Sequence, residues 1–475
     1  MFEAVIGIEV HCELKTKTKM FSGAPVTFGN PPNTQVHVID MAMPGTLPSV
    51  NKKGVEMAIR VCRALHMKID DLLRFDRKNY YYADLPKGFQ ITQYFHPIGQ
   101  HGYLDIEVNQ QLLRIDIERL HIEEDTAKMT HYDDCTLIDY NRSGIPLIEI
   151  VTLPQMHNSQ QVCAYLEALR MILIYTDVSD AIMAEGSMRV DVNISLRPQG
   201  SHTLGEKVEI KNLNALSNVQ KAIDYEIQRQ TYLLEQHRPV LRQTRRFDEK
   251  SQTTVLMREK ESLLDYRYYP EPNILPVRLD NRWIENIKQQ LPLLPNQKKS
   301  LYQETYGLSS QDTKILLSHK DISLFYDQVI SIYPYYHTCC HWLIGDVMAY
   351  IRQHKKHIND LLTVQDFAEL MNMLKQEKVS SKQAKQILEF MILEKKSPLI
   401  VMKEHHMQSL NDENMLRSLI EEVLDEYPQL VYDYHCGKTN VCGFFVGQVM
   451  KKTSGQAHPQ KTNELLRQML EKRKI

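Results

Sequence analysis

Charged side chains alternate with apolar residues near the start of the chain. In residues 6–14 the even positions are apolar, whereas Glu9, His11 and Glu13 take odd positions. Alternate residues of a β-strand point to one face and lie about 6.6–7 Å apart, so these carboxylate and imidazole groups could converge on one bound cation or on neighbouring cations. A strand face exposed to water would show the same alternation, and this segment alone leaves that alternative open.

Two later segments repeat this pattern. In residues 188–196 the even positions are apolar, and Arg189 and Asp191 are among the polar residues at odd positions. Glu209 and Lys211 share the predicted face of a third strand. Carboxylates and cationic groups are therefore interleaved on several strands.

Buried acids are expected at two further places. Glu149 stands in a run, residues 146–151, that is apolar on both predicted strand faces. An ionised carboxylate is costly to bury, so Glu149 requires a cationic side chain, a metal ion or a proton. A predicted strand that ends in Glu123, Glu124 and Asp125 likewise requires positive charge or protons at one edge of the sheet.

Together these strands predict a sheet whose polar face holds divalent cations, with lysine and arginine alongside for phosphate groups. Such a combination suits phosphoryl transfer, and carboxylate oxygens favour Mg²⁺. A salt-bridged sheet that binds no ion is the alternative. The sequence contains neither a P-loop nor the glycine-rich loop of protein kinases, so a nucleotide would have to bind this sheet by another route.

Two lysines near aromatic residues could neutralise a triphosphate. Lys78 lies within residues 76–82, which include three consecutive tyrosines, and Lys87 lies in the predicted turn 85–88. The tyrosines could stack on a base, although a surface hairpin with aromatic contacts would have the same composition. Residues 266–269 mix arginine with tyrosine, which suits RNA or substrate and equally suits ion-paired packing.

The elements that must position these residues change character along the chain. Up to about residue 290 the pattern has period two and predicts a sheet, interrupted by helical patterns at 162–173 and 219–227. After residues 290–296, helical periodicity and capping signals such as Thr363 with Asp366 predict helices. A break near 403–412 precedes a last unit that ends in a basic amphipathic helix.

These boundaries predict an α+β protein with a mainly antiparallel sheet domain followed by an all-α domain and a small α-helical tail domain. The expected domains are 1–292, 293–405 and 406–475, within the two to four that a chain of 475 residues allows.

Bulk composition narrows the class of protein. The net charge of −2 gives no overall signal for nucleic acid, so any RNA contact needs a local basic surface. No long apolar run or signal sequence is present, which predicts a soluble cytoplasmic protein without a membrane partner. The eight cysteines show no Cys-x-x-Cys pairs, which argues against a disulfide framework or a zinc ribbon. No glutaminase apparatus is recognisable, so any ammonia would come from another polypeptide.

Eight segments of the chain, taken together and in their order along the sequence, closely resemble the B subunits of the aspartyl/glutamyl-tRNA amidotransferases. The segments that carry the resemblance are Val5 to His11, Pro44 to Pro48, Phe75 to Tyr80, Leu120 to Asp125, Asp139 to Val151, Glu209 to Asn214, Tyr266 to Pro272 and Gly447 to Met450. They are long and chemically unusual, and they span almost the whole chain.

The resemblance implies a cradle-shaped sheet domain with a kinase site, a helical domain, and a helical tail that binds tRNA. It implies that ATP phosphorylates the side-chain carboxylate of Glu-tRNA(Gln) or Asp-tRNA(Asn), and that ammonia from the glutaminase (amidase) subunit then displaces the phosphate. A heterotrimer with this amidase subunit and a further small subunit is expected.

The resemblance also implies roles for individual residues. The divalent-ion ligands and nearby carboxylates would be Glu9, His11, Glu124, Glu149, Asp191 and Glu209, of which Glu149, Asp191 and Glu209 are the expected catalytic groups. The expected contacts to the phosphates of ATP are Lys78, Lys87, Arg189 and Lys211.

The chain departs from the family pattern at Leu153, Ala215 and Asn273, where an acid, a serine and an acid are expected. Two alternative functions remain: a metal-dependent phosphotransferase for a small-molecule carboxylate, and a non-catalytic tRNA-binding scaffold. The basic terminal helix, with Lys461, Arg467, Lys472, Arg473 and Lys474, favours a phosphate backbone as ligand over a small molecule.

Overall fold

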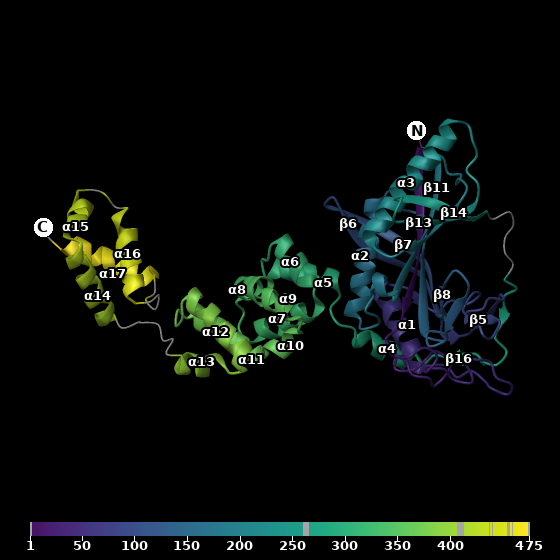
Figure 1. The fold of residues 1–475 in the computed structure, drawn as a ribbon, viewed down its shortest axis with the longest axis horizontal. Helices are drawn as coiled ribbons and strands as arrows, with labels where there is room; N and C mark the ends of the chain where they lie inside the picture. Colours follow the sequence, from purple (N-terminus) through teal and green to yellow (C-terminus); the bar gives the residue numbers. More distant parts are fainter. Residues whose placement is uncertain are drawn as a thin grey trace. The chain divides into compact units, whose positions relative to one another are not determined.

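The computed structural model describes residues 2–259, 266–405, 413–436, 438, 440–453, 457 and 459–473. The chain divides into two compact units, Met1–Pro295 and Asn296–Ile475. The first unit is built on a sheet and the second is helical, so the predicted α+β class is confirmed (Figure 1). The predicted division into 1–292, 293–405 and 406–475 stays a prediction, and the predicted break near 403–412 falls partly on residues 406–412, outside the described residues.

A nine-stranded sheet forms the centre of the first unit. Its strand order is β14-β13-β12-β11-β1-β10-β7-β6-β2, and every neighbouring pair is antiparallel except β12 and β13. The strands are β1 (Phe2–Glu13), β2 (Lys68–Ile69), β6 (Gly99–Val108), β7 (Gln111–Glu124), β10 (Pro146–Thr152), β11 (Met188–Pro198), β12 (Val208–Leu213), β13 (Gln243–Asp248) and β14 (Thr253–Glu259).

Smaller elements surround this sheet. The short strands are β3 (Leu72–Leu73), β4 (Asp76–Asn79), β5 (Phe89–Thr92), β8 (Lys128–His131), β9 (Thr136–Asp139), β15 (Tyr269–Pro270) and β16 (Val277–Arg278). The helices of this part are α1 (Lys52–Ala64), α2 (Ser159–Tyr175), the 3₁₀-helix η1 (Met183–Glu185), α3 (Leu216–Glu235) and α4 (Asn281–Gln289). β15, β4 and β5 form a separate three-stranded sheet.

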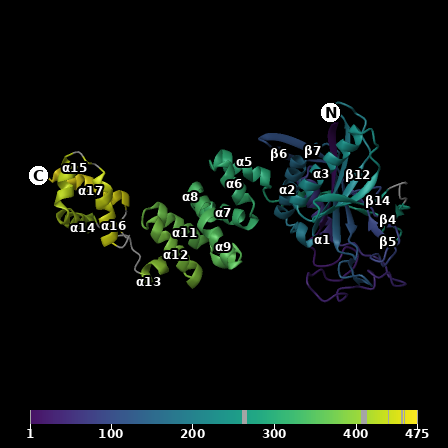
Figure 2. The same cartoon turned by 45° about the horizontal axis from the view of Figure 1, so that its top comes forward.

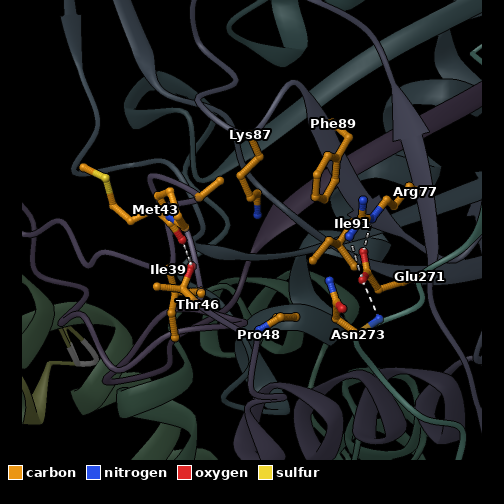
Figure 3. Close-up of a pocket in the computed structure, with 13 residues that line it drawn as sticks. Ile39, Met43, Thr46, Pro48, Arg77, Lys87, Phe89, Ile91, Glu271 and Asn273 are labelled. Carbon is orange, nitrogen blue, oxygen red and sulfur yellow. Dashed lines mark hydrogen bonds and ion pairs between the residues drawn. The ribbon is translucent and has the colours of Figure 1, made fainter.

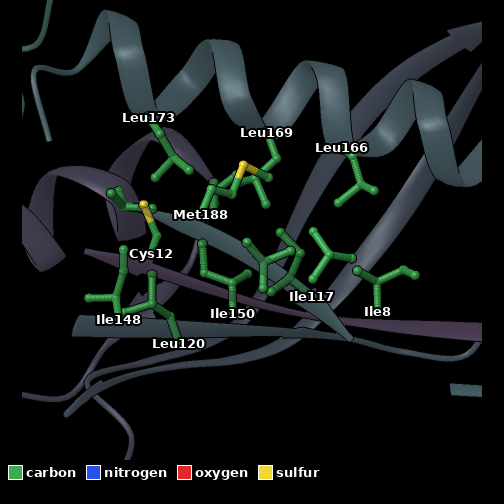
Figure 4. Packing of buried hydrophobic residues seen from close by; sticks show 14 of the residues in the cluster. Ile8, Cys12, Ile117, Leu120, Ile148, Ile150, Leu166, Leu169, Leu173 and Met188 are labelled. Carbon is green, nitrogen blue, oxygen red and sulfur yellow. The ribbon is translucent and has the colours of Figure 1, made fainter. Parts of the chain in front are cut away.

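Helices α2 and α3 cover one face of the large sheet, as the helical periodicity predicts. They lie side by side in both views (Figure 1 and Figure 2). Leu166, Leu169 and Leu173 of α2 point toward buried side chains of the strands, including Ile148 and Ile150 (Figure 4). Because side chains alternate along each strand, burying the apolar face under these helices leaves the polar residues on the other face.

The helices of the second unit and of the boundary are short. They are α5 (Pro295–Ser300), η2 (Leu301–Thr305), α6 (Ser310–Leu317), α7 (Lys320–Ile332), α8 (Tyr336–Trp342), η3 (Leu343–Val347), α9 (Met348–His354), α10 (Ile358–Leu361), α11 (Val364–Lys375), α12 (Ser381–Glu394), α13 (Pro398–Glu404), α14 (Glu413–Glu426), α15 (Pro428–His435), α16 (Val441–Lys452) and α17 (Pro459–Lys472). The hydroxyl of Thr363 caps α11 by accepting from the backbone N–H of Asp366, as predicted. Helices α14 to α17 share a hydrophobic cluster of their own. None of the helices in the described ranges is long and apolar enough to cross a membrane.

The departure at Ala215 has a structural consequence. Ala215 is the N-cap residue of α3, with the extended backbone that capping residues adopt (φ −154°, ψ 154°), and its side chain makes no capping hydrogen bond. Serine, threonine, asparagine or aspartate at this position accepts a bond from a backbone N–H in the first turn.

We therefore expect Ala215→Ser to stabilise the chain by about 1 kcal/mol, measured as an increase in the free energy of unfolding in urea. Ala215→Val is the control, since valine has no oxygen to accept the bond and should give no gain. An equal stability for Ala215→Ser and the parent chain would contradict the capping interpretation.

Candidate active site

Strand register brings distant residues of the sequence together on the polar face of the sheet. β1 lies between β10 and β11, with His11 opposite Glu149 on one side and Glu9 opposite Asp191 on the other. Glu149 is in turn opposite His121 of β7. The site is therefore assembled by backbone hydrogen bonding between strands.

Two histidines and two glutamates form the first group, which we call the histidine cluster: His11, His121, Glu123 and Glu149. One carboxylate oxygen of Glu149 lies 3.0 Å from Nε2 of His121 and 3.3 Å from Nε2 of His11. Oxygens of Glu123 lie 3.5 Å from Nε2 of His121 and 3.8 Å from Nε2 of His11. Ligand atoms of His11, Glu123 and Glu149 all lie within 4.8 Å of one another, close enough to hold one metal ion.

The charges of the histidine cluster stabilise each other. Burial opposes the ionised form of Glu149, but the positive charges of His121 and His11 hold its pKa well below the usual range. Burial likewise opposes the charged imidazoles, yet the charge of Glu149 and contacts with Glu123 raise the pKa of both His11 and His121 to about 9. Glu149 was expected to need a cation beside it, and these two histidines supply it.

Three carboxylates form the second group, the carboxylate cluster: Glu9, Asp191 and Glu209. Their oxygens also lie within 4.8 Å of one another. Nζ of Lys211 lies 2.6 Å from Oδ2 of Asp191 and 3.0 Å from Oε1 of Glu209, and the amide of Asn193 donates to Oε1 of Glu9 at 2.7 Å. These residues come from the three adjacent strands β1, β11 and β12.

The carboxylate cluster concentrates negative charge. The ammonium group of Lys211 contacts two of the three carboxylates and offsets part of their charge. Burial and then the charge of Glu149 raise the pKa of Glu9, while Asp191 and Glu209 raise the pKa of Lys211 against the effect of its burial. Oδ1 of Asn193 is buried and has no hydrogen-bond partner among the described residues. Hard oxygen donors held this close together fit a divalent cation such as Mg²⁺.

Glu124 lies apart from both clusters. Its carboxylate forms an ion pair with Lys87 and accepts a hydrogen bond from the backbone N–H of Ile91 at 3.0 Å. Side chains alternate along β7, so His121 and Glu123 share the face of Glu149 and Glu124 points the other way. Glu123, which was not predicted as a ligand, therefore faces the cluster, and the predicted role of Glu124 at the metal site stays a prediction.

Lys87 also lines a pocket of about 260 Å³. Met43 and Thr46 lie on one side of this pocket and Phe89 and Arg77 on the other, with Lys87 between them (Figure 3). Asn273, where an acid was expected, lines the same pocket, and its backbone N–H donates to Glu271 at 2.8 Å. Lys87 reaches Glu124 and this pocket, and its predicted contact to phosphate stays a prediction.

The other predicted cations have varied surroundings. Nη2 of Arg189 lies 2.8 Å from Oδ2 of Asp125. Burial, and then the negative charge of Asp125, raise the pKa of the neighbouring Glu13 to about 8. Nζ of Lys78 lies 4.9 Å from the ring centre of Tyr266. Lys211 directly contacts carboxylates of a cluster.

His121 and Glu123 were not predicted as site residues. The signal was present, since His121 and Glu123 are two residues apart on one strand, as Glu9 and His11 are. What the sequence did not reveal is that this face of β7 adjoins Glu149.

Comparison with known proteins assigns the family. A family model described as the GatB/GatE catalytic domain matches residues 4–285, which places the first unit in a class of catalytic domains. A second model, described as the GatB domain, matches residues 324–470.

Full-length relatives agree with these matches. The chain is 44% identical over 473 residues to the B subunit of the aspartyl/glutamyl-tRNA(Asn/Gln) amidotransferase of Macrococcus caseolyticus, covering 99% of this chain and 100% of that protein. The proteins of the same name from Staphylococcus carnosus (45% identical over 473 residues) and Geobacillus kaustophilus (44% identical over 474 residues) also match over 99% of this chain and 100% of their own length. The chain belongs to the family of aspartyl/glutamyl-tRNA amidotransferase B subunits, and the resemblance found in the sequence is confirmed.

The histidine cluster predicts a pH dependence of stability when metal is removed. Because the pKa of His11 and of His121 rises from an ordinary 6.5 to about 9 on folding, their protonation stabilises the fold. This stabilisation is complete below pH 6.5 and is lost as the pH rises through about 9. In the presence of a chelator, the free energy of unfolding in urea should therefore fall between pH 6.5 and 9.

Glu149→Gln should remove much of this pH dependence, because it takes away the charge that both histidines face. Glu118→Gln on β7 is the matched control, since Glu118 is half exposed and belongs to neither cluster. A slope that is the same in the parent chain and in Glu149→Gln would show that the histidines are not paired in this way.

Proposed function

We propose that this chain is the component of a tRNA-dependent amidotransferase that uses ATP and Mg²⁺ to phosphorylate the side-chain carboxylate of Glu-tRNA(Gln), Asp-tRNA(Asn) or both. The observation that carries this proposal is the meeting of the histidine and carboxylate clusters on one sheet face within the matched catalytic domain. The names of the relatives supply the substrate class, aspartyl- and glutamyl-tRNA.

The proposed reaction has two steps. A carboxylate oxygen of the aminoacyl group attacks the γ-phosphorus of ATP, the bond from that phosphorus to the bridging oxygen breaks, and ADP leaves. Ammonia then attacks the acyl carbon, inorganic phosphate leaves, and the nitrogen loses a proton to give the amide. The attacking carboxylate is already ionised, so the first step needs no general base and depends on alignment and charge neutralisation.

The chain's residues have distinct tasks in this scheme. Glu9, Asp191 and Glu209 would hold one cation, and His11, Glu123 and Glu149 would hold a second. When bound, Mg²⁺ supplies positive charge that neutralises the phosphate oxygens. Lys211 offsets part of the negative charge of the carboxylate cluster, and Asn193 orients Glu9 through its hydrogen bond. His121 holds Glu149 in place from the neighbouring strand.

Lysines and arginines near the clusters are proposed to contact phosphate. Lys211 lies within the carboxylate cluster, and Arg189 stands directly opposite His11 in the sheet. Lys78 lies in β4, and Lys87 lies shortly before β5. We propose that all four residues contact phosphate, and the geometry supports Lys211 best.

The family supports a proposal about partners and location. We propose a heterotrimer, acting in the cytoplasm, in which a glutaminase (amidase) subunit supplies ammonia and a small third subunit completes the enzyme. The relatives are named as the B subunit of an amidotransferase, which implies an enzyme of several polypeptides. The sequence contains no recognisable glutaminase apparatus, in accord with a division of labour between them.

The helical tail favours tRNA over a small-molecule substrate. Arg467 and Lys472 of α17 are exposed, and exposed cations on one helix suit a phosphate backbone. Nη2 of Arg473 pairs with Asp425, and Lys474 lies outside the described residues. A scaffold without catalysis would leave the two clusters unexplained, so the tRNA-dependent enzyme accounts for most of the molecule.

Asp191→Asn tests the chemistry. We expect the assembled complex to cleave ATP only when Mg²⁺ and misacylated tRNA are both present, and this activity to fall by about 100-fold or more in Asp191→Asn while tRNA still binds. Asp105→Asn is the matched control, because Asp105 lies on β6 of the same sheet and pairs with Arg114. Cleavage of ATP that is indifferent to charged tRNA would favour the small-molecule phosphotransferase.

Substitutions on α17 test the tail. Arg467→Gln and Lys472→Gln should each weaken tRNA binding and lower the slope of log affinity against log salt concentration by about 0.7–0.9 per phosphate contact. Glu464→Gln on the same helix is the control and should not weaken binding. A salt slope that stays constant in both cation variants would exclude this helix as a phosphate-binding surface.

A further inference from the structure

Two aromatic side chains beside the histidine cluster are half exposed. Tyr94 and Phe95 follow β5, with 49% and 50% of their surface exposed. The ring of Tyr94 stacks on the ring of Tyr268, with 3.9 Å between ring centres and 11° between planes. Phe95 meets Tyr94 edge to face at 5.1 Å. One face of the Tyr94 ring is thus covered by Tyr268, and half of the residue remains open.

The stack continues toward a lysine. Tyr268 contacts Tyr266 at 6.1 Å between ring centres, and Tyr266 contacts Tyr80 at 5.8 Å, both edge to face. Nζ of Lys78 lies 4.9 Å from the centre of the Tyr266 ring. The backbone N–H of Asn79 donates to the carbonyl of Tyr266 at 2.9 Å, which joins the two segments.

The carboxylates of the site lie close enough to affect these rings. Burial raises the pKa of Tyr268, and the negative charges of Glu149 and Glu123 raise it further. Burial also raises the pKa of Tyr80, and the charges of Asp84 and Glu123 add to this effect. The segment that carries Tyr94 also contacts β7 directly. The hydroxyl of Thr92 donates to Oε2 of Glu123 at 3.4 Å, and Oε1 of Gln93 accepts from the backbone N–H of Ile122 at 3.0 Å. The aromatic group therefore adjoins the histidine cluster, where the proposed reaction would occur.

We propose that Tyr94, supported by Tyr268, is a stacking platform for the adenine ring of a substrate, with Lys78 placed for an adjacent phosphate. This inference rests on the proposed function, in which both large substrates carry adenine: ATP, and the 3′-terminal adenosine of tRNA. Stacking suits this position because a π-face binds a base without needing hydrogen bonds, and the Tyr268 ring holds the Tyr94 ring in a fixed plane.

The test compares Tyr94→Leu with Tyr94→Phe in the assembled enzyme. Tyr94→Leu removes the aromatic face and keeps an apolar side chain, whereas Tyr94→Phe keeps the face and loses the hydroxyl. We expect Tyr94→Leu to raise KM roughly 5-fold to 150-fold for one substrate, the range for loss of one stacked base. Tyr94→Phe should stay within about 2-fold of the parent enzyme, as should Tyr232→Leu, which alters another exposed tyrosine, on α3.

Which substrate responds identifies the source of the adenine. A selective rise in KM for ATP assigns the platform to the nucleotide, and a selective rise in KM for misacylated tRNA assigns it to the 3′ end. Unchanged KM values, or equal increases in KM for both substrates, would overturn the inference. So would an increase in KM for Tyr94→Phe as large as the increase for Tyr94→Leu. A parent enzyme that cleaves no ATP with charged tRNA would instead refute the proposed function itself.

Discussion

Repulsion between closely spaced carboxylates is the constraint on which the site depends. Glu9, Asp191 and Glu209 have oxygens within 4.8 Å of one another, and Glu149 lies near enough to raise the pKa of Glu9 further, beyond the effect of burial. Such an arrangement persists only where cations or bound protons offset the charge. In the histidine cluster two imidazolium groups do so. In the carboxylate cluster Lys211 offsets part of the negative charge. We propose that a divalent ion offsets the negative charge that remains.

The opposite face of the sheet holds this arrangement in register. A slip of one residue between two strands would turn every side chain to the other face, placing Glu9 and His11 under the helices and apolar residues in the site. The packing of Leu166, Leu169 and Leu173 against the sheet makes such a slip costly. Stability and function are therefore coupled through strand register, because the apolar contacts of α2 fix the positions of the charged groups on the other side.

Part of this could be predicted from the sequence and part could not. Period-two alternation on β1 and β11 showed that Glu9, His11 and Asp191 lie on polar strand faces, because alternation is a local property of the chain. Pairing between strands is not local, so the sequence did not show that His121 lies opposite Glu149. The sequence also did not show which of Glu123 and Glu124 faces the cluster, because a shift of one position at the end of a strand reverses the faces of its residues. The helices 162–173 and 219–227 were predictable because their apolar periodicity extends over several turns.

The most direct test of the account is to locate bound metal. Crystals of the complex soaked in Mn²⁺ and measured near the manganese absorption edge would show each ion by its anomalous scattering. The account predicts one peak among Glu9, Asp191 and Glu209 and a second among His11, Glu123 and Glu149. Peaks at neither place would contradict it.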